Sequence, residues 1–314
     1  MKICAIDIGT NTFLLLIANI DPQGRITPLV QLQRMPRIGR SVDAGGRIGA
    51  EAFSPAAAIL SEFASHAASH SCDVIAACAT SAVRDAVNRS DFIGEMERRS
   101  GIRIEILSGE EEAALTYRGA VSRFGAAPVS SAVIDIGGGS TEIISADASG
   151  TLHPVSLQLG AVRITERFFR ADPPAGEELE AAARFVDAAF NAVATRTDDR
   201  RQLIAVAGTA TTLACFDLGL NRYEGKDVEG YIMEVTRVTY WRNRLSALSS
   251  REILSLSSVA GGREDIITAG VMILERAMVG FGFREVTMTE RGLRYGIALR
   301  EFDRRTSQVR PASG

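Results

Sequence analysis

The sequence predicts an α/β protein of two lobes, and three observations indicate this fold class. Apolar runs of strand length alternate with helical patterns along most of the chain. The length of 314 residues corresponds to about two domains of ordinary size. The same device, an apolar run followed by Asp, a Gly-rich turn and hydroxyl side chains, occurs at 6–12 and again at 134–141. This internal repeat predicts that each half of the chain opens with the same hairpin.

The first half is typical of a β-meander followed by alternating helices and strands. A helix is expected to begin at Ser54, because Ser is a favoured N-cap and Pro55 suits the first helical position. A second helix is expected from the capping box of Ser108 and Glu111 to about residue 124. Shorter helices are expected near 82–87 and from residue 90. The predicted strands are 2–8, 13–19, 27–34, 73–79 and 102–107.

The second half restarts the pattern and becomes mostly helical in its last third. A strongly amphipathic helix is predicted over 177–195. The predicted strands are 131–136, 142–146, 151–158, 203–207 and 285–289. The expected boundaries are 1–124 for the first lobe, with a helix at about 291–304 packing back on it, 125–290 for the second lobe, and 305–314 for a frayed tail.

Composition excludes several classes of protein. A net charge of −3 and a pI of about 5.8 argue against a general nucleic-acid binder, which is usually basic. The four cysteines form no CxxC pair, so a disulfide framework or a zinc site is not expected. The apolar N-terminus is too short to span a membrane, is interrupted by Asp7 and Asn11, and lacks a cleavage site. We therefore expect a cytoplasmic protein with no membrane partner.

Both Gly-rich turns carry groups that bind phosphate. Glycines expose consecutive backbone N–H groups and let an anion approach closely, and the hydroxyls add donors. Asp7 and Asp135 stand at the ends of the preceding strands, and carboxylates at such turns suit Mg²⁺, which prefers oxygen ligands. Two ordinary β-turns are the alternative, but a matched pair favours one site shared by the lobes. The turn residues are Thr10, Asn11, Thr12, Gly137, Gly138, Gly139, Ser140 and Thr141.

Two further segments carry candidate groups. Gly208 and Thr209 follow the predicted strand 203–207 and precede a helix, an arrangement that can hold an anion but can equally be structural. Arg84 follows a strand and a Thr-Ser turn, so it is a candidate for a phosphate contact or an ordinary surface arginine.

Three adjacent acids follow Ser108. Neighbouring side chains on a helix are about 100° apart, so Glu110, Glu111 and Glu112 point in different directions. Glu111 belongs to the capping box, which leaves Glu110 and Glu112 as candidates for a catalytic carboxylate. The helix dipole favours the ionised form, which can accept a proton from an attacking water. Three acids that merely stabilise the helix N-terminus are the alternative.

These motifs resemble the exopolyphosphatase and guanosine pentaphosphate phosphohydrolase family, a branch of the actin, hexokinase and Hsp70 superfamily. The resemblance covers about residues 2–300. It rests, in order, on AIDIGTNTFLLLIA, ATSAVRDAVN, LSGEEEAALTYRGA, VIDIGGGSTEI, AGTATTLA, GGREDIITAG and RGLRYG. It implies two actin-like (ribonuclease H-like) lobes, each a mixed β-sheet with helices, with the active site in the cleft between them. Longer members carry further helical domains, so the chain resembles the short, two-domain form.

The resemblance also implies a role for each matching residue. Glu112 would activate the attacking water, and Asp135 would be associated with the metal. Asp7 and Glu142 would support the Mg²⁺ site, and Arg84 would contact phosphate. The residues implied to hold phosphates are Thr10, Asn11, Thr12, Gly137, Gly138, Gly139, Ser140, Thr141, Gly208 and Thr209.

The implied activity is hydrolysis of a terminal phosphate, with two candidate substrates. Inorganic polyphosphate is favoured over guanosine pentaphosphate. A kinase on the same fold and a non-catalytic sensor of either anion are the more distant alternatives. A homodimer is an option that the resemblance leaves open. The chain departs from the family at 228–230, where Glu replaces a frequent His, and at 289–296, and these changes bear on substrate preference.

Overall fold

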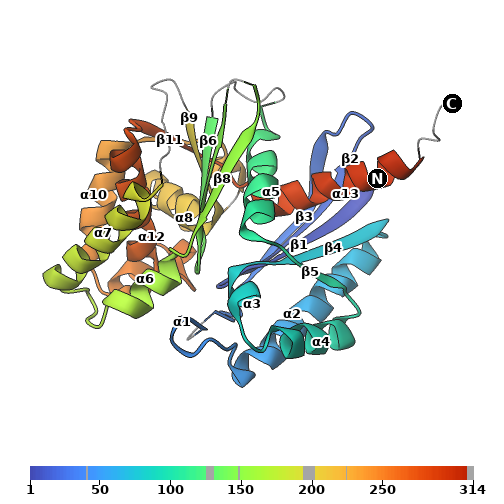
Figure 1. The fold of residues 1–314 in the computed structure, drawn as a ribbon, viewed down its shortest axis with the longest axis horizontal. Coiled ribbons are helices and arrows are strands. Elements are labelled where there is room, and N and C mark those ends of the chain that lie inside the picture. Colours follow the sequence, from blue (N-terminus) through green and yellow to red (C-terminus); the bar gives the residue numbers. More distant parts are fainter. Residues whose placement is uncertain (40–41, 125–130, 148, 194–201, 224, 310–314) are drawn as a thin grey trace. The chain divides into compact units, whose positions relative to one another are not determined.

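A computed structural model describes residues 1–39, 42–124, 131–147, 149–193, 202–223 and 225–309. The chain divides into two compact units, each of which contains one β-sheet and its helices (Figure 1). Unit 1 comprises Met1–Arg123 and Gly292–Gly314, and unit 2 comprises Phe124–Arg291. In the part of the chain that the structure describes, no helix is long and apolar enough to cross a membrane.

Unit 1 is built on a five-stranded mixed sheet in the order β3-β2-β1-β4-β5. The first three strands form the predicted antiparallel meander, and β4 and β5 continue the sheet parallel to β1. Side chains of β1 are buried on both faces, which explains why this strand is an almost continuous apolar run. The strands are β1 (Lys2–Ile8), β2 (Phe13–Ile20), β3 (Ile26–Arg34), β4 (Val74–Ala79) and β5 (Ile104–Ile106).

Helices cover both faces of the unit 1 sheet. Apolar side chains of α2 and α4 pack with Ile6 and Ile8 on one face, whereas α13 packs with Ile3 and Ala5 on the other and lies beside α5. The C-terminal helix therefore belongs to the same core as the N-terminal strand. The helices are α1 (Val42–Gly45), α2 (Ala50–Ser69), α3 (Ser81–Asp85), α4 (Arg89–Ser100), α5 (Gly109–Val121) and α13 (Leu293–Val309).

Two predicted ends in unit 1 are wrong. Helix α2 begins at Ala50 rather than near Ser54. The edge-on packing of Phe53 against Phe92 stabilises the additional first turn. Pro55 lacks an N–H and therefore removes only one backbone hydrogen bond near the start of the helix. Helix α13 continues to Val309, where a frayed tail was predicted from residue 305. An Arg305–Glu301 ion pair one turn apart supports that last stretch. Residues 310–314 lie outside the described residues.

Unit 2 is built on a six-stranded sheet in the order β10-β11-β9-β6-β7-β8. The strands β6, β7 and β8 form an antiparallel meander, and β9 and β11 lie parallel to β6. Strand β10 is not among the predicted strands, because its three residues are too few to show alternation. The strands are β6 (Ser131–Ile136), β7 (Thr141–Ala146), β8 (Leu152–Leu157), β9 (Gln202–Val206), β10 (Ile232–Glu234) and β11 (Glu285–Met288).

The helices of unit 2 share one large core with its sheet. The amphipathic helix predicted over 177–195 is α7, which ends at Asn191; residues 194 and 195 lie outside the described residues. The described helices are α6 (Ala161–Phe168), α7 (Gly176–Asn191), α8 (Ala207–Leu218), α9 (Gly225–Val228), α10 (Val235–Ser246), α11 (Ser250–Leu256) and α12 (Ile267–Phe281). All four cysteines are free thiols, as the sequence predicts.

Candidate functional site

The two Gly-rich turns have the same backbone. In unit 1, the amide of Gly9 donates to the carbonyl of Thr12 at 3.1 Å, and in unit 2 the amide of Gly137 donates to the carbonyl of Ser140 at 3.0 Å. Each turn joins the ends of two antiparallel strands of its own sheet. The repeat seen in the sequence is therefore a repeat of conformation, in which Gly137–Ser140 corresponds to Gly9–Thr12.

The carbonyls of the unit 1 turn are held by a later segment. Gly39 donates its amide to the Thr10 carbonyl at 2.9 Å, and Arg37 donates its amide to the Asn11 carbonyl at 3.2 Å. In a trans peptide the N–H points opposite to the C=O. The amides of Asn11 and Thr12 therefore point away from 37–39, an orientation suited to an anion.

The carbonyls of the unit 2 turn face the beginning of α6. Ala161 donates its amide to the Gly137 carbonyl, and Val162 donates its amide to the Gly138 carbonyl, both at 2.9 Å. The backbone at Gly160 lies so close that a Cβ there would be 2.3 Å from the Gly138 oxygen. The amides of Gly138 and Gly139 consequently point away from α6, as phosphate binding requires.

Two predicted phosphate-binding hydroxyls have partners within their own unit. The Thr10 Oγ1 lies 2.9 Å from the Oγ of Ser81, which is the first residue of α3. Thr141 donates its hydroxyl to the Leu159 carbonyl at 2.5 Å and has no exposed surface. Its counterpart in unit 1 is Phe13, a core residue. The Thr141 hydroxyl therefore fixes the fold locally, and its role as a phosphate ligand stays a prediction.

The predicted metal carboxylates occupy equivalent strand positions. Asp7 and Asp135 each stand one residue before the end of the strand that precedes the turn, and Asp135 lies directly opposite Glu142 on the neighbouring strand. Glu142 is buried, and it accepts a hydrogen bond from Ser156 at 2.8 Å. Two adjacent carboxylates on one face of a sheet repel each other unless a cation lies between them.

The oxygen donors of this pair can be compared with those that Mg²⁺, the predicted metal, prefers. No group of three His, Cys, Asp or Glu side chains that could hold a metal occurs among the described residues. Mg²⁺, however, is usually bound by one or two carboxylates and completes its shell with water and substrate phosphates. The Asp135–Glu142 pair therefore matches the donor set of a substrate-linked Mg²⁺ rather than that of a structural metal.

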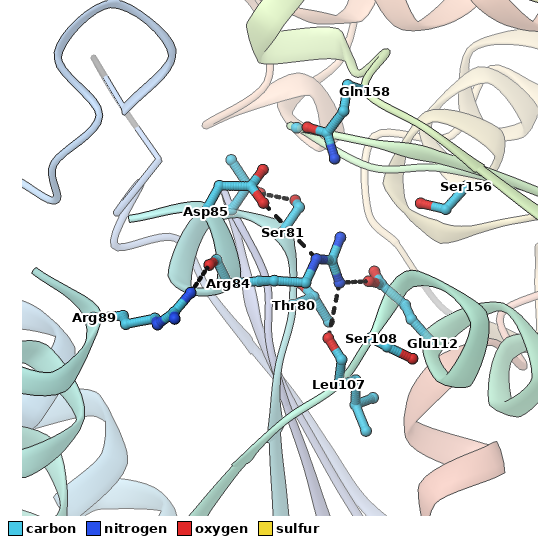
Figure 2. A network of polar contacts seen from close by, with 12 residues as sticks. Thr80, Ser81, Arg84, Asp85, Arg89, Leu107, Ser108, Glu112, Ser156 and Gln158 are labelled. Carbon is cyan, nitrogen blue, oxygen red and sulfur yellow. Dashed lines mark hydrogen bonds and ion pairs between the residues drawn. The ribbon is translucent and has the colours of Figure 1, made fainter. Parts of the chain in front are cut away.

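A buried ion pair joins α5 to α3 in unit 1 (Figure 2). Glu112, in the first turn of α5, is 6% exposed, and its Oε2 accepts a hydrogen bond from Arg84 Nη1 at 2.8 Å. The same nitrogen donates to the Leu107 carbonyl at 3.0 Å. Glu110 is exposed and Glu111 closes the predicted capping box with Ser108. Of the three adjacent acids, Glu112 alone faces Arg84.

The surroundings of Glu112 strengthen it as a base. Burial raises the pKa of Glu112, the hydrogen bond and positive charge of Arg84 oppose that rise, and the charge of Asp85 adds to it. A carboxylate with a raised pKa accepts a proton more readily than an ordinary one. The Arg84 Nη2 is buried and has no hydrogen-bond partner in the described part of the chain. A buried guanidinium N–H of this kind suits an anionic oxygen.

Gly208 and Thr209 lie in the first turn of α8 rather than in a separate turn. The preceding Ala207 has a φ of 65°, a conformation that costs a non-glycine residue about 1–2 kcal/mol. A Cβ at Gly208 would be 2.4 Å from the Nε of Arg263, so the guanidinium packs directly on this helix N-terminus. Burial lowers the pKa of Arg263 to about 10, which leaves it protonated at neutral pH.

Sequence reasoning located the turns but missed the residues that hold them. Gly39, Gly160 and Arg163 contact the turn residues without belonging to a recognisable phosphate-binding pattern. Ser81, which contacts Thr10, lies in the ATSAVRDAVN motif but was not singled out. Within unit 1 the structure links the first turn to Arg84 and Glu112 through α3, and within unit 2 it brings Asp135 and Glu142 to the second turn. The location of the site in a cleft between the lobes stays a prediction.

Comparison with known proteins finds related proteins that match nearly the whole chain and belong to one family. The model of the Ppx/GppA phosphatase family matches residues 16–305. Exopolyphosphatase 2 of Mycobacterium tuberculosis is 31% identical over 95% of this chain and 98% of its own. Two solved structures are also similar. An exopolyphosphatase from Cytophaga hutchinsonii is 27% identical with a TM-score of 0.86, covering 96% of this chain and 98% of its own. The Aquifex aeolicus member of the Ppx/GppA family is 26% identical with a TM-score of 0.81, covering 97% and 98%.

These likenesses confirm the predicted fold class of two actin-like lobes, each with a mixed sheet and helices. They also confirm an enzyme of the phosphoric anhydride hydrolase class. The family model matches most of both units and the second turn, and its match begins after the first strand and the first turn. The relative from Mycobacterium tuberculosis is covered almost completely. The chain belongs to the Ppx/GppA phosphatase family.

Proposed function

We propose that this chain removes the terminal phosphate from inorganic polyphosphate, with Glu112 as the base that activates water. The observation that carries this proposal is the buried Glu112–Arg84 pair, which combines a carboxylate of raised pKa with a buried guanidinium N–H that has no hydrogen-bond partner in the described part of the chain. The exopolyphosphatase names of the relatives support polyphosphate as the substrate.

In unit 1, Glu112 accepts the proton of the attacking water as the water oxygen bonds to the terminal phosphorus. The bridging P–O bond to the rest of the chain breaks, which releases orthophosphate and a polyphosphate shortened by one phosphate. Arg84 holds the carboxylate through Nη1 and directs Nη2 to the oxygens of the transferring phosphoryl group. Phosphoryl transfer needs mostly positioning and charge stabilisation, so one base and oriented donors account for the protein's part in it. The amides of Asn11 and Thr12 add donors on the same unit.

In unit 2, the amides of the second turn bind phosphate oxygens, and Asp135 and Glu142 would hold Mg²⁺. Mg²⁺ supplies neutralisation of phosphate charge when it is bound. Asp7 occupies the equivalent strand position in unit 1 and is the third carboxylate proposed to support the metal. We expect phosphate release to stop when the ion is removed with EDTA and to return when Mg²⁺ is added.

The test is phosphate release by the purified chain from long-chain polyphosphate and from guanosine pentaphosphate, measured side by side with Mg²⁺. Glu112→Gln should lower kcat by about 10²–10⁴, the usual contribution of a general base. Glu110→Gln is the matched control, because this exposed acid lies on the same helical turn and should leave kcat unchanged.

Each outcome assigns a function. Release from polyphosphate that Glu112→Gln loses establishes the exopolyphosphatase and its base. Phosphate release from the nucleotide alone would show that guanosine pentaphosphate is the substrate. Release from neither favours a sensor or a kinase, and full turnover by a folded Glu112→Gln variant would show that another group is the base. The cytoplasmic location and the homodimer stay predictions.

A further inference from the structure

Arg163 makes an unusual contact with the second phosphate turn. This residue lies in the first turn of α6, and its Nε donates to the carbonyl of Gly139 at 2.9 Å. Its backbone amide also donates to the Gly138 carbonyl at 3.1 Å. One residue thus binds two successive carbonyls of the turn, one through its backbone and one through its side chain.

The first turn shows what this side chain replaces. There the carbonyl of Asn11, the counterpart of Gly139, accepts from a backbone amide, that of Arg37 at 3.2 Å. In unit 2 the chain enters helix α6 after Gly160, and the helical amides of Ala161 and Val162 are already used by the Gly137 and Gly138 carbonyls. The guanidinium of Arg163 provides the donor that the backbone provides in unit 1.

We propose that Arg163 is a positioning residue that orients the peptide between Gly139 and Ser140, and thereby the Ser140 amide, for phosphate binding. This inference rests on the proposed function. With the Gly139 carbonyl bound to Nε, the Ser140 N–H points the opposite way, in line with the Gly138 and Gly139 amides. Three consecutive N–H groups then face the same side, which forms an anion-binding concavity.

The composition of the turn explains why such a donor is needed. Gly138 and Gly139 leave the backbone free to rotate, since glycine tolerates almost all combinations of φ and ψ. An anion binds weakly to a peptide that must first be ordered, so fixing the peptide beforehand increases affinity. Arg163 is itself fixed, because its Nη2 donates to Gln158 Oε1 at 2.8 Å. A lysine would retain the charge but has no donor at the Nε position.

The experiment measures binding and turnover separately. Binding of inorganic tripolyphosphate is measured by calorimetry in the Glu112→Gln background, where hydrolysis is expected to be slow, and KM and kcat for polyphosphate are measured with Glu112 intact. We expect Arg163→Met to raise both Kd and KM by about 5- to 30-fold, the equivalent of one oriented hydrogen bond. The expected change in kcat is less than about threefold, because Glu112 and Arg84 are untouched.

Two further variants separate positioning from charge. Arg163→Lys should lose nearly as much affinity as Arg163→Met, although it keeps the positive charge. Arg167→Met, one helical turn later, removes a charge from α6 where the guanidinium stacks 4.3 Å from the Phe185 ring centroid. It should leave Kd and KM unchanged. Thermal unfolding of each variant checks that the fold is intact.

The results that would overturn the inference are specific. An unchanged Kd in Arg163→Met, or wild-type affinity in Arg163→Lys, would show that the Nε donor does not position the turn. A fall in kcat with KM unchanged would also contradict it. Tripolyphosphate binding that depends on Arg163 in a chain that hydrolyses no polyphosphate would refute the proposed function and keep this inference. No tripolyphosphate binding by the Glu112→Gln parent would refute both.

Discussion

The two Gly-rich turns of this protein share one backbone conformation and differ in what holds it. In unit 1, the segment 37–39 supplies two backbone amides, and the turn itself carries Thr10, Asn11 and Thr12. In unit 2, the N-terminal amides of α6 and the side chain of Arg163 supply the donors, and the turn is made of three glycines and a serine. The carbonyls of the first turn are bound by backbone amides, and those of the glycine-rich second turn are bound partly by the Arg163 side chain.

This difference separates two functions of the repeat. The unit 1 turn contacts Ser81 on α3, the helix that carries Arg84, and Arg84 pairs with Glu112. It therefore belongs to a network that contains the proposed base. The unit 2 turn lies beside the Asp135–Glu142 pair, which suits a metal ion. Under the proposed function, the first turn lies beside the base, and the second turn binds phosphate and Mg²⁺.

Among the changes that compare the two turns, we expect the largest effect where a new Cβ would clash with the backbone of a turn. In Gly160→Ala, the new Cβ would lie 2.3 Å from the Gly138 oxygen and 2.6 Å from the Gly139 carbonyl carbon, and backbone atoms cannot move without opening the turn. We expect kcat/KM for polyphosphate to fall by about 10²-fold and the free energy of unfolding to fall by about 1–3 kcal/mol.

The matched variant in unit 1 is Gly39→Ala. Its Cβ would lie 2.0 Å from the Thr10 Cγ2, a side-chain atom that can rotate away at the expense of the contact with Ser81. We expect a smaller loss in kcat/KM, about tenfold. Both effects are read from steady-state kinetics and urea unfolding. A larger loss in Gly39→Ala would show that the unit 1 turn is the more rigidly constrained of the two.

A smaller effect distinguishes a phosphate ligand from a structural hydroxyl at the second turn. Thr141→Val removes the donor to the Leu159 carbonyl, so we expect the free energy of unfolding to fall by about 1–2 kcal/mol with little change in kcat/KM. Ser140→Ala, one residue earlier, should lower kcat/KM and leave stability nearly unchanged. The reverse pattern, measured by the same two assays, would establish Thr141 as a ligand.

The sequence predicted both turns because their signature is local. Asp, glycines and hydroxyls stand within eight residues, and the flanking apolar runs pair at once as hairpins. The capping box, a four-residue pattern, assigns Glu111 to the helix N-terminus and so excludes it as the catalytic carboxylate. The preference for Glu112 over Glu110 as that carboxylate came from the family resemblance. The burial of Glu112 against Arg84 now gives that choice a physical basis.

What the sequence could not predict is set by contacts between distant segments. Gly39 and Arg163 reach their turns from about 25 residues further along the chain, and neither stands in a pattern that indicates phosphate. Thr141 was grouped with the turn because of its hydroxyl, whereas its strand position makes it interior. The edge strand β10 was missed because three residues carry too little periodicity.

The smallest predicted effect concerns how the proposed base contributes to stability. Because burial raises the pKa of Glu112, the folded state holds this proton more tightly than the unfolded chain does. Glu112 therefore contributes to the free energy of unfolding below the pKa that a Glu has in the unfolded chain, about 4.3. This contribution is lost as the pH rises through the raised pKa of Glu112 in the folded state. As the pH rises from the unfolded pKa through the raised folded pKa, the wild type should therefore lose unfolding free energy relative to Glu112→Gln, measured in urea.

Glu110→Gln is the matched control, because it removes an exposed acid from the same helical turn. A wild type that gained stability relative to Glu112→Gln as the pH rose would mean that the attraction of Arg84 outweighs burial. Glu112 would then be a stabilising ion-pair partner with a lowered pKa, and the contrast between a catalytic first turn and a phosphate-binding second turn would lose its main support.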